Sequence, residues 1–279
     1  MEPRQASLEG DHPLRRRAVT GVVLAAVALG ALAAGGVWFL LLVAAVAAGA
    51  SFELARLLEI RRTPRHRLAL LLAAATVAAT VSVHRFGLLG GVAVLIGMAA
   101  LAAVVRAALG ERPWPAALAA VYLGLPLSLL LWLRQWNPEG DWLTLWLLAV
   151  VAATDIGGYT VGRTLRGPRL APRLSPGKTW SGLLGAVVFA SATGGGIALW
   201  LHGPSLPAVA GATGLAAVLA LVAQAGDLVE SWLKRRAGFK DSGRLLPGHG
   251  GLLDRFDGLL FATPVYALFV ALMSAGRAS

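Results

Sequence analysis

The chain has 279 residues, of which 57% are hydrophobic and 14% are charged. A soluble domain carries roughly 25% charged residues, so this composition excludes an ordinary solvated globule. The absence of cysteine excludes disulfides, iron–sulfur clusters and thiolate zinc sites. The net charge of +11 is more typical of basic cytoplasmic loops beside anionic lipid than of a protein that binds nucleic acid.

A polar N-terminal tail is followed by apolar runs of about 20 residues, the length that crosses a hydrocarbon core. We expect residues 1–14 to form a disordered cytoplasmic tail. A retained first helix is favoured over a cleaved signal peptide, because a second apolar run follows directly. Lipid cannot satisfy open backbone groups, so the runs are predicted to be helices. The predicted fold is an all-α polytopic integral membrane protein with about nine transmembrane helices, over residues 18–34, 37–58, 68–84, 86–108, 116–133, 142–162, 180–201, 206–233 and 257–275.

The distribution of lysine and arginine predicts the orientation of these spans. With a cytoplasmic N-terminus and nine spans, all but three of the 25 basic residues fall on the cytoplasmic side. One span more or fewer would move whole basic clusters to the other side. We expect a single membrane domain, with N-terminal helices in residues 15–150 and the less ordinary polar segments in residues 151–279. The first two spans could also form one hairpin with a break at Gly35 and Gly36. The three basic residues that do not fall on the cytoplasmic side in this arrangement are Arg85, Arg134 and Arg277.

The segment from Ser231 to Asp257 is the least ordinary part of the sequence. Its basic residues, alone, would be explained by anchoring on the cytoplasmic side. The glycine-rich stretch 247–251 could form a simple turn, or could bring backbone amides close to a phosphate. Asp254 and Asp257 share one face at the start of the last span. A helix-capping role explains Asp254 well, but explains Asp257, which lies nearer the lipid, poorly.

A further acid, Asp227, lies near the end of the preceding span, one turn before Glu230. Carboxylates at membrane depth are costly and are usually paired or metal-bound. Convergence of Asp227, Asp254 and Asp257 would create an oxygen-rich site suited to Mg²⁺ and substrate phosphates. The alternative is an interhelical hydrogen bond with a neighbouring basic side chain.

A second polar region begins at Asp155, within an otherwise apolar span, and continues into the stretch Ser175 to Thr179. The stretch offers hydroxyls, the cation Lys178 and a following helix N-terminus, a combination that binds phosphate. The spacing of a Walker A loop is absent. The alternative is a capped, basic cytoplasmic loop.

Together these residues resemble the phosphatidate cytidylyltransferase family. The upstream pattern D-x-G-x-Y…G-R and S-P-x-K-T-W-x-G runs from Asp155 to Gly182, and Gly177 stands where many members have a second lysine. The resemblance is specific from about residue 150 onwards. The downstream motif is filled by Ser231, Lys234, Arg235, Lys240, Asp241, Gly243, Pro247, His249, Gly250, Gly251, Asp254, Arg255 and Asp257.

The resemblance implies transfer of a cytidylyl group from CTP to phosphatidic acid, giving CDP-diacylglycerol and pyrophosphate for phospholipid biosynthesis. It implies a membrane-embedded helical fold whose residues 151–279 form the catalytic region. It also implies Mg²⁺ with a second cation such as K⁺, membrane lipid as a partner and a homodimer, without nucleic acid. The inner (plasma) membrane, with the site facing the cytoplasm, is the expected location.

The residue types suit this chemistry, because a phosphate monoester is already an anion and needs no strong base. Metal and cationic stabilisation with in-line positioning should dominate. We expect Asp227, Asp254 and Asp257 to be metal ligands and, with Lys178, catalytic. Lys178, Lys240 and Arg255 would neutralise phosphates, and Ser175 with the Gly250 and Gly251 amides would donate hydrogen bonds. The expected substrate-binding set is Asp155, Ser175, Lys178, Thr179, Lys234, Arg235, Lys240, His249, Gly250, Gly251 and Arg255.

Three other functions fit parts of the pattern. A secondary transporter could use Asp155 and Asp227 as ion ligands, but the polar residues concentrate at one interface. A CDP-alcohol phosphotransferase would need an arginine soon after Asp257 and Gly258, and this chain has only Leu259 to Ala262 there. A lipid-binding scaffold could use the basic loops alone.

Overall fold

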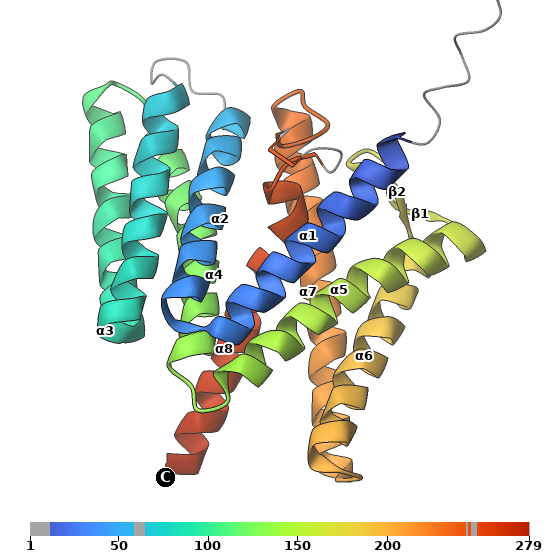
Figure 1. Cartoon of the computed structure of the whole chain (residues 1–279). Coiled ribbons are helices and arrows are strands. Elements are labelled where there is room, and N and C mark those ends of the chain that lie inside the picture. The colour runs from blue at the N-terminus through green and yellow to red at the C-terminus, as the bar shows by residue number, and fades with distance from the viewer. Residues whose placement is uncertain (1–11, 59–64, 244, 247–249, 279) are drawn as a thin grey trace, which may run out of the picture.

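The computed structural model describes residues 12–58, 65–243, 245–246 and 250–278. Within these residues the chain is helical apart from one short β-hairpin and one isolated bridge. Consecutive helices run in alternating directions between two ends of the molecule (Figure 1). The elements are α1 (His12–Ala34), α2 (Gly36–Leu57), α3 (Arg65–Ala108), α4 (Trp114–Gln135), α5 (Gly140–Leu165), β1 (Arg169–Ala171), β2 (Ser175–Thr179), α6 (Trp180–His202), α7 (Leu206–Arg236) and α8 (Leu253–Ala278).

Seven helices in the described part of the chain are long and apolar enough to cross a membrane. The predicted spans 68–84 and 86–108 both lie in α3, where Gly87 adopts φ 74° and the helical conformation is interrupted. The chain folds back at this glycine, so that two helices stand side by side (Figure 1). The apolar part of α1, Thr20–Ala34, is shorter than the seven. The helical membrane architecture is confirmed, whereas nine crossings stay a prediction.

Two details of the sequence prediction change. Residues 12–14, predicted to be part of the disordered tail, begin α1, and the rest of that tail lies outside the described residues. The stretch 163–179, which the predicted spans 142–162 and 180–201 leave as a connection, contains the antiparallel hairpin in which Arg169 pairs with Thr179 and Ala171 with Ser175. The break at Gly35 and Gly36, which belonged to the alternative reading of the first two spans as one hairpin, is present, because Gly35 has φ 62° between α1 and α2.

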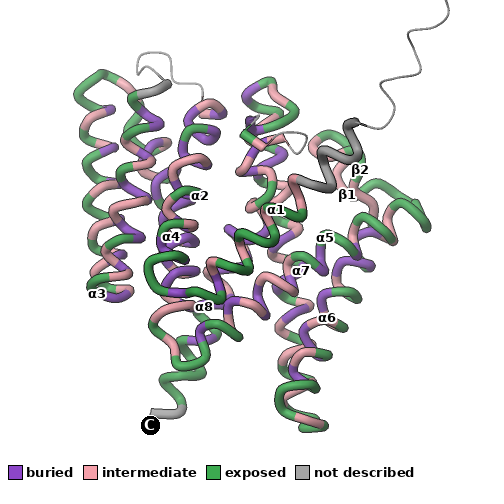
Figure 2. The backbone as a smooth tube through the Cα atoms, viewed as in Figure 1, coloured by how far each residue is buried: buried purple, intermediate pink, exposed green. Residues whose placement is uncertain are grey.

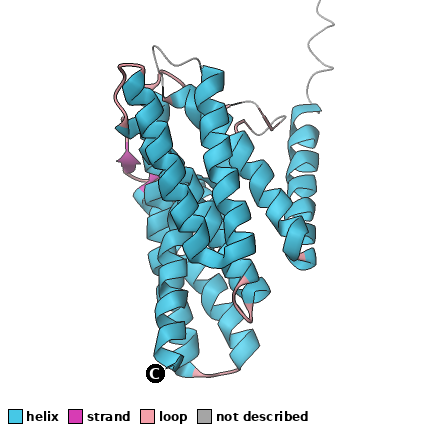
Figure 3. Cartoon of the chain, turned by 90° about the vertical axis from the view of Figure 1, so that its left-hand side faces the viewer, coloured by secondary structure: helices cyan, strands magenta, loops and turns pink. Residues whose placement is uncertain are grey.

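The two ends of the molecule differ. One end, here called the motif end, holds the β1–β2 hairpin and the described part of the α7–α8 connection, residues 237–243, 245–246 and 250–252 (Figures 1 and 3). The other, here called the far end, holds Gly35, Gly87, the α4–α5 connection at residues 136–139 and the C-terminus. The predicted basic loops, as far as the structure describes them, therefore gather at the motif end.

Exposed tryptophans lie near both ends of the helices, as expected where a membrane protein meets the two lipid–water interfaces. Buried residues alternate with exposed ones along the helices (Figure 2), and many of the exposed residues are large and apolar. Such an exterior is suited to lipid and unsuited to water. The exposed tryptophans are Trp114, Trp180 and Trp232 toward the motif end, and Trp38, Trp136, Trp142 and Trp200 toward the far end.

Glycines let the helices that carry the polar residues approach closely. A Cβ on Gly157 of α5 would overlap with the backbone of Gly185 in α6. A Cβ on Gly226 of α7 would lie 2.7 Å from the Asp257 carbonyl oxygen of α8. These contacts hold α5 against α6 and α7 against α8, close in the chain to Asp155, Asp227 and Asp257.

Candidate active site

A buried carboxylate on α2 holds the connection between α7 and α8. Glu53 is only 4% exposed. Its Oε1 accepts a hydrogen bond from the Leu252 N–H at 3.0 Å, and its Oε2 accepts from the Leu253 N–H at 2.8 Å and the Ser242 hydroxyl at 3.0 Å. The first N–H groups of a helix have no partner within the helix. Glu53 therefore caps α8 from a segment about 200 residues earlier in the chain.

Two glycines of the motif enclose this carboxylate. A Cβ on Gly243 would overlap with Glu53 Oε1, and a Cβ on Gly251 would overlap with the Ser242 hydroxyl and lie 2.7 Å from Glu53 Oε2. These positions therefore need glycine for space. The guanidinium of Arg56, also on α2, lies 4.2 Å from the centre of the Phe239 ring and makes a second link to the same connection.

Asp254 holds the connection from the other side. Its carboxylate accepts hydrogen bonds from the Gly251 N–H at 2.9 Å and from the Ser242 N–H at 3.2 Å. Lys234 Nζ lies 2.8 Å from Asp254 Oδ1 and 3.1 Å from Glu230 Oε1, so one lysine joins two acids. Both Asp254 oxygens thus contribute to the shape of this connection.

Lys178 joins the β1–β2 hairpin to α7. Its Nζ lies 2.6 Å from Asp227 Oδ2 and donates a hydrogen bond to Gln224 Oε1 at 2.7 Å. The Ser231 hydroxyl donates to the other Asp227 oxygen at 3.3 Å. The two polar regions of the sequence, more than 40 residues apart, therefore meet in one site.

The hairpin is positioned by local contacts that include Thr179. The Thr179 hydroxyl oxygen accepts from the Gly182 N–H at 3.0 Å and so caps α6, a frequent use of threonine. Ser181 donates to the Arg166 carbonyl, which ties the start of α6 to the end of α5. A Cβ at the exposed Gly177 would meet open space, so packing does not require glycine there.

Three acids from different helices lie within electrostatic reach of one another: Asp155 on α5, Asp227 on α7 and Asp257 on α8. Lys178 and Arg255 also lie within electrostatic reach of Asp155. Asp257 accepts the Gly258 N–H at 2.7 Å. A carboxylate set of this kind fits the oxygen preference of Mg²⁺. No three acidic, histidine or cysteine side chains in the described residues are already placed as a complete metal site.

The other predicted substrate-binding residues lie around this centre. Arg235 donates to the Leu174 carbonyl at 3.3 Å and the Phe239 carbonyl at 3.2 Å, and so braces the hairpin. Lys240 is exposed at the motif end, and Ser175 is half-buried at the start of β2. Gly250 has φ 82°, a conformation that glycine adopts readily. His249 lies outside the described residues.

Comparison with known proteins identifies the family to which the chain belongs. The model of the cytidylyltransferase family matches residues 15–273, nearly the whole chain. The chain belongs to the cytidylyltransferase family. The phosphatidate cytidylyltransferase of Brucella suis biovar 1 is 41% identical, covering 94% of this chain and 94% of the relative. That of Pseudomonas aeruginosa is 36% identical, covering 91% of this chain and 96% of the relative.

A third relative, the phosphatidate cytidylyltransferase of Bacillus subtilis, is 38% identical over 56% of this chain and 58% of its own length. The resemblance seen in the sequence was specific only from about residue 150. The family match extends to the N-terminal helices as well.

The structure adds residues to the site of this family member that the sequence did not single out. Glu53 and Gln224 contact the motif directly, and Tyr122 of α4 lies within electrostatic reach of Glu230 and Asp257. Glu230 is fully buried. An acid inside the apolar span 37–58 was a visible signal for Glu53, but nothing in its surroundings indicated its partners.

Proposed function

We propose that the protein transfers the cytidylyl group of CTP to phosphatidic acid, producing CDP-diacylglycerol and pyrophosphate for phospholipid biosynthesis. The observation that carries this proposal is the Lys178–Asp227 contact, which joins two polar regions at one end of a bundle of apolar helices. Membership of the cytidylyltransferase family and the names of the relatives support it. They also argue against the transporter and the scaffold alternatives.

The reaction is a displacement at phosphorus. A phosphate oxygen of phosphatidic acid attacks the α-phosphorus of CTP, the bond from that phosphorus to the bridging oxygen breaks, and pyrophosphate leaves with the bond electrons. The attacking group is already an anion, so the chief barrier is repulsion between two negatively charged reactants. Fixed positive charge and in-line positioning are therefore the main requirements.

Lys178 suits the role of a phosphate-binding cation. Its ammonium is held by Asp227 and Gln224 at the end of β2, so little rearrangement is needed when a phosphate approaches. Arg255, at the start of α8 and within electrostatic reach of Asp155, adds a second cation. The phosphatidic acid headgroup would enter from the adjacent lipid and CTP from the water.

Mg²⁺ would be held chiefly by Asp227 and Asp257, with Asp155 as the third nearby acid. A bound Mg²⁺ would offset the negative charge of the phosphates and orient them. In this proposal Asp254 holds the α7–α8 connection in shape, because its oxygens accept hydrogen bonds from Lys234 and from the amides of Ser242 and Gly251. The second cation and the homodimer implied by the family resemblance are part of the same proposal.

The topology proposed is nine crossings with the N-terminus and the motif end in the cytoplasm. The gathering of the basic loops at the motif end supports it, because cytoplasmic loops carry an excess of lysine and arginine. The inner (plasma) membrane is the corresponding location, and it places the site where CTP is available.

The test uses purified protein in detergent with CTP, phosphatidic acid and Mg²⁺, and measures both CDP-diacylglycerol and pyrophosphate. Equal amounts of the two products are expected, with UTP and ATP as nucleotide controls. Lys178→Gln should greatly reduce turnover, while the exposed far-end variant Arg85→Gln should not. Absence of both products with wild-type protein, or pyrophosphate release without CDP-diacylglycerol, would rule out the proposed transfer.

A further inference from the structure

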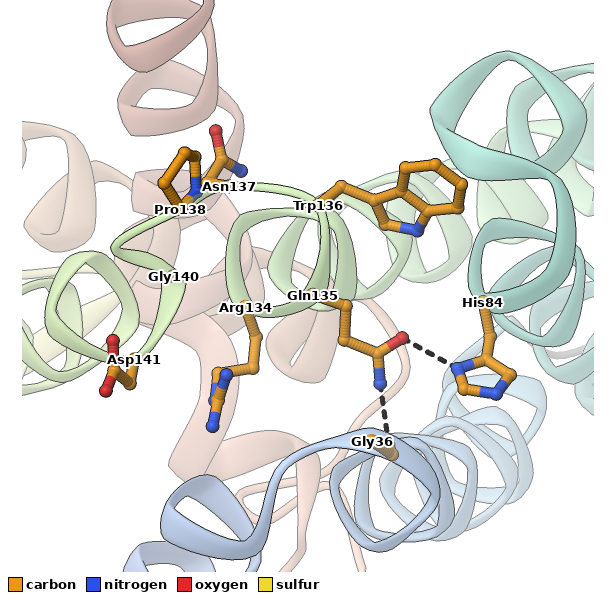
Figure 4. A pocket seen from close by; sticks show the side chains of 9 residues that line it. All are labelled: Gly36, His84, Arg134, Gln135, Trp136, Asn137, Pro138, Gly140 and Asp141. Atoms are coloured by element: carbon orange, nitrogen blue, oxygen red, sulfur yellow. Dashed lines mark hydrogen bonds between the residues drawn. The ribbon is translucent and has the colours of Figure 1, made fainter.

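A polar hollow of about 540 Å³ lies at the far end, away from Lys178 and Asp227. It is bounded by the start of α2, the kink region of α3 and the connection between α4 and α5 (Figure 4). The proposed reaction uses none of its residues. Those that matter here are Gly36, His84, Arg134, Gln135 and Asp141.

Arg134 is held in place and points toward the hollow. Its Nε donates to the Leu32 carbonyl at 2.9 Å, and its Nη2 would lie 2.7 Å from a Cβ on Gly35. The guanidinium is therefore pinned across the break between α1 and α2. Among the described residues, its two terminal nitrogens have no hydrogen-bond or ion-pair partner. Four N–H donors of a fixed, planar cation are thus available to a ligand.

The wall beside Arg134 is also held rigidly. His84 Nδ1 and Gln135 Oε1 are 2.7 Å apart, and Gln135 Nε2 donates to the Gly36 carbonyl at 2.6 Å (Figure 4). Trp136 donates through its indole N–H to the Val83 carbonyl at 2.9 Å. These bonds join α2, α3 and α4 around the hollow, so its shape does not depend on a ligand.

The position of Arg134 is unusual for a basic residue in this chain. Among the residues that the structure describes, only Arg85, Arg134 and Arg277 are lysines or arginines at the far end. The exposed Trp136 lines the hollow, and the exposed Trp38 and Trp142 are close in sequence to its lining residues Gly36 and Asp141. Exposed tryptophans of this kind mark the depth of lipid headgroups. A pinned arginine at this depth has the geometry for two parallel hydrogen bonds to a phosphate.

We propose that this hollow binds the phosphate group of a phospholipid headgroup, from the leaflet opposite to the motif end. Asp141 lines the same hollow, on the other side of Arg134 from His84 (Figure 4). Its exposed carboxylate would accept hydrogen bonds from an ammonium group. The pair Arg134 and Asp141 therefore favours a zwitterionic ethanolamine headgroup over a glycerol headgroup. The site is separate from the reaction and does not depend on the proposed function.

The test measures lipid binding to delipidated full-length protein by native mass spectrometry. The probes are short-chain phosphatidylethanolamine, short-chain phosphatidylglycerol and inorganic phosphate. Arg134→Gln is compared with Arg85→Gln, which removes a neighbouring exposed arginine that does not line the hollow. We expect Arg134→Gln to weaken phosphatidylethanolamine binding about tenfold and Arg85→Gln to leave it unchanged.

A second variant keeps the proposal testable if Arg134→Gln does not fold. Asp141→Asn leaves the arginine contacts intact and should remove the preference for phosphatidylethanolamine over phosphatidylglycerol. Cytidylyl transfer should stay normal in both variants. Equal lipid binding by Arg134→Gln and Arg85→Gln would overturn the proposal. So would displacement of the lipid by inorganic phosphate at the same concentration, which would indicate a site for free phosphate only.

Discussion

The replacement Glu53→Gln tests how far catalysis depends on a residue of α2. The carboxylate accepts three hydrogen bonds, from Leu252, Leu253 and the Ser242 hydroxyl. A glutamine can keep its carbonyl oxygen on the side of Leu253 and Ser242. Its NH₂ group then faces the Leu252 N–H, so one charge-assisted hydrogen bond is lost and one buried donor is left without an acceptor. Loss of such a bond costs about 1.5–3 kcal/mol.

The lost free energy should destabilise the α7–α8 connection before the rest of the fold, because all three hydrogen-bond partners of Glu53 lie in that connection or at the start of α8. If the connection must be formed for catalysis, kcat/KM for CTP should fall about 10- to 100-fold, at about 1.4 kcal/mol for each factor of ten. Hydrogen exchange at the Leu252 and Leu253 amides should accelerate, while the central turns of the helices stay protected. Glu139→Gln, at an exposed acid of the far end without a side-chain capping bond, is the matched control. Unchanged kcat/KM together with faster exchange at these amides would refute a role for Glu53 in positioning the site.

Five other substitutions, in four tests, separate the roles within the site. Asp257→Asn should abolish Mg²⁺-dependent turnover in detergent while Tm stays near the wild-type value; near-normal turnover would remove Asp257 from the metal site. Asp254→Asn should lower Tm and activity but leave the Mg²⁺ concentration for half-maximal activity unchanged, and a large rise in that concentration would make Asp254 a metal ligand as well. Lys178→Met should lower turnover and raise the KM for CTP about tenfold, as expected for loss of one ionic phosphate contact; an unchanged KM together with an unchanged kcat would limit Lys178 to bracing the hairpin. Gly243→Ala should lower activity because its Cβ overlaps with a buried carboxylate, whereas Gly177→Ala, in open space, should retain it, and equal activities would contradict the packing argument.

The membrane helices were predictable because lipid sets both their length and their composition. Each predicted span lies inside a helix, except that 37–58 ends one residue beyond α2. The spans 68–84 and 86–108 lie on either side of Gly87, where a positive φ lets the chain fold back. The gathering of the two polar regions at one end also followed from counting crossings. The β1–β2 hairpin was not predicted, because strands of three and five residues with one proline and one glycine give no alternating pattern.

The contacts inside the site were less predictable than its location. The sequence singles out Lys178, Asp227 and Asp257, but it does not say which acid each lysine contacts. The structure pairs Lys178 with Asp227 and Lys234 with Asp254. That choice depends on how α7 rotates against α8 and on where the hairpin folds, and both are set by packing between glycines such as Gly226 and the opposite helix.

The predicted division at residue 150 describes where the motif lies but not what holds it in place. Glu53 and Arg56 of α2 contact the α7–α8 connection directly, and the ring of Tyr122 on α4 packs edge-on against Phe261 of α8, with centres 6.1 Å apart. Without α2, the Leu252 and Leu253 amides would lose a buried acceptor, and water cannot replace it readily inside the bundle. The N-terminal helices therefore belong to the same cooperative unit as the motif. This accounts for a family match that begins at residue 15 although the recognisable chemistry begins only at Asp155.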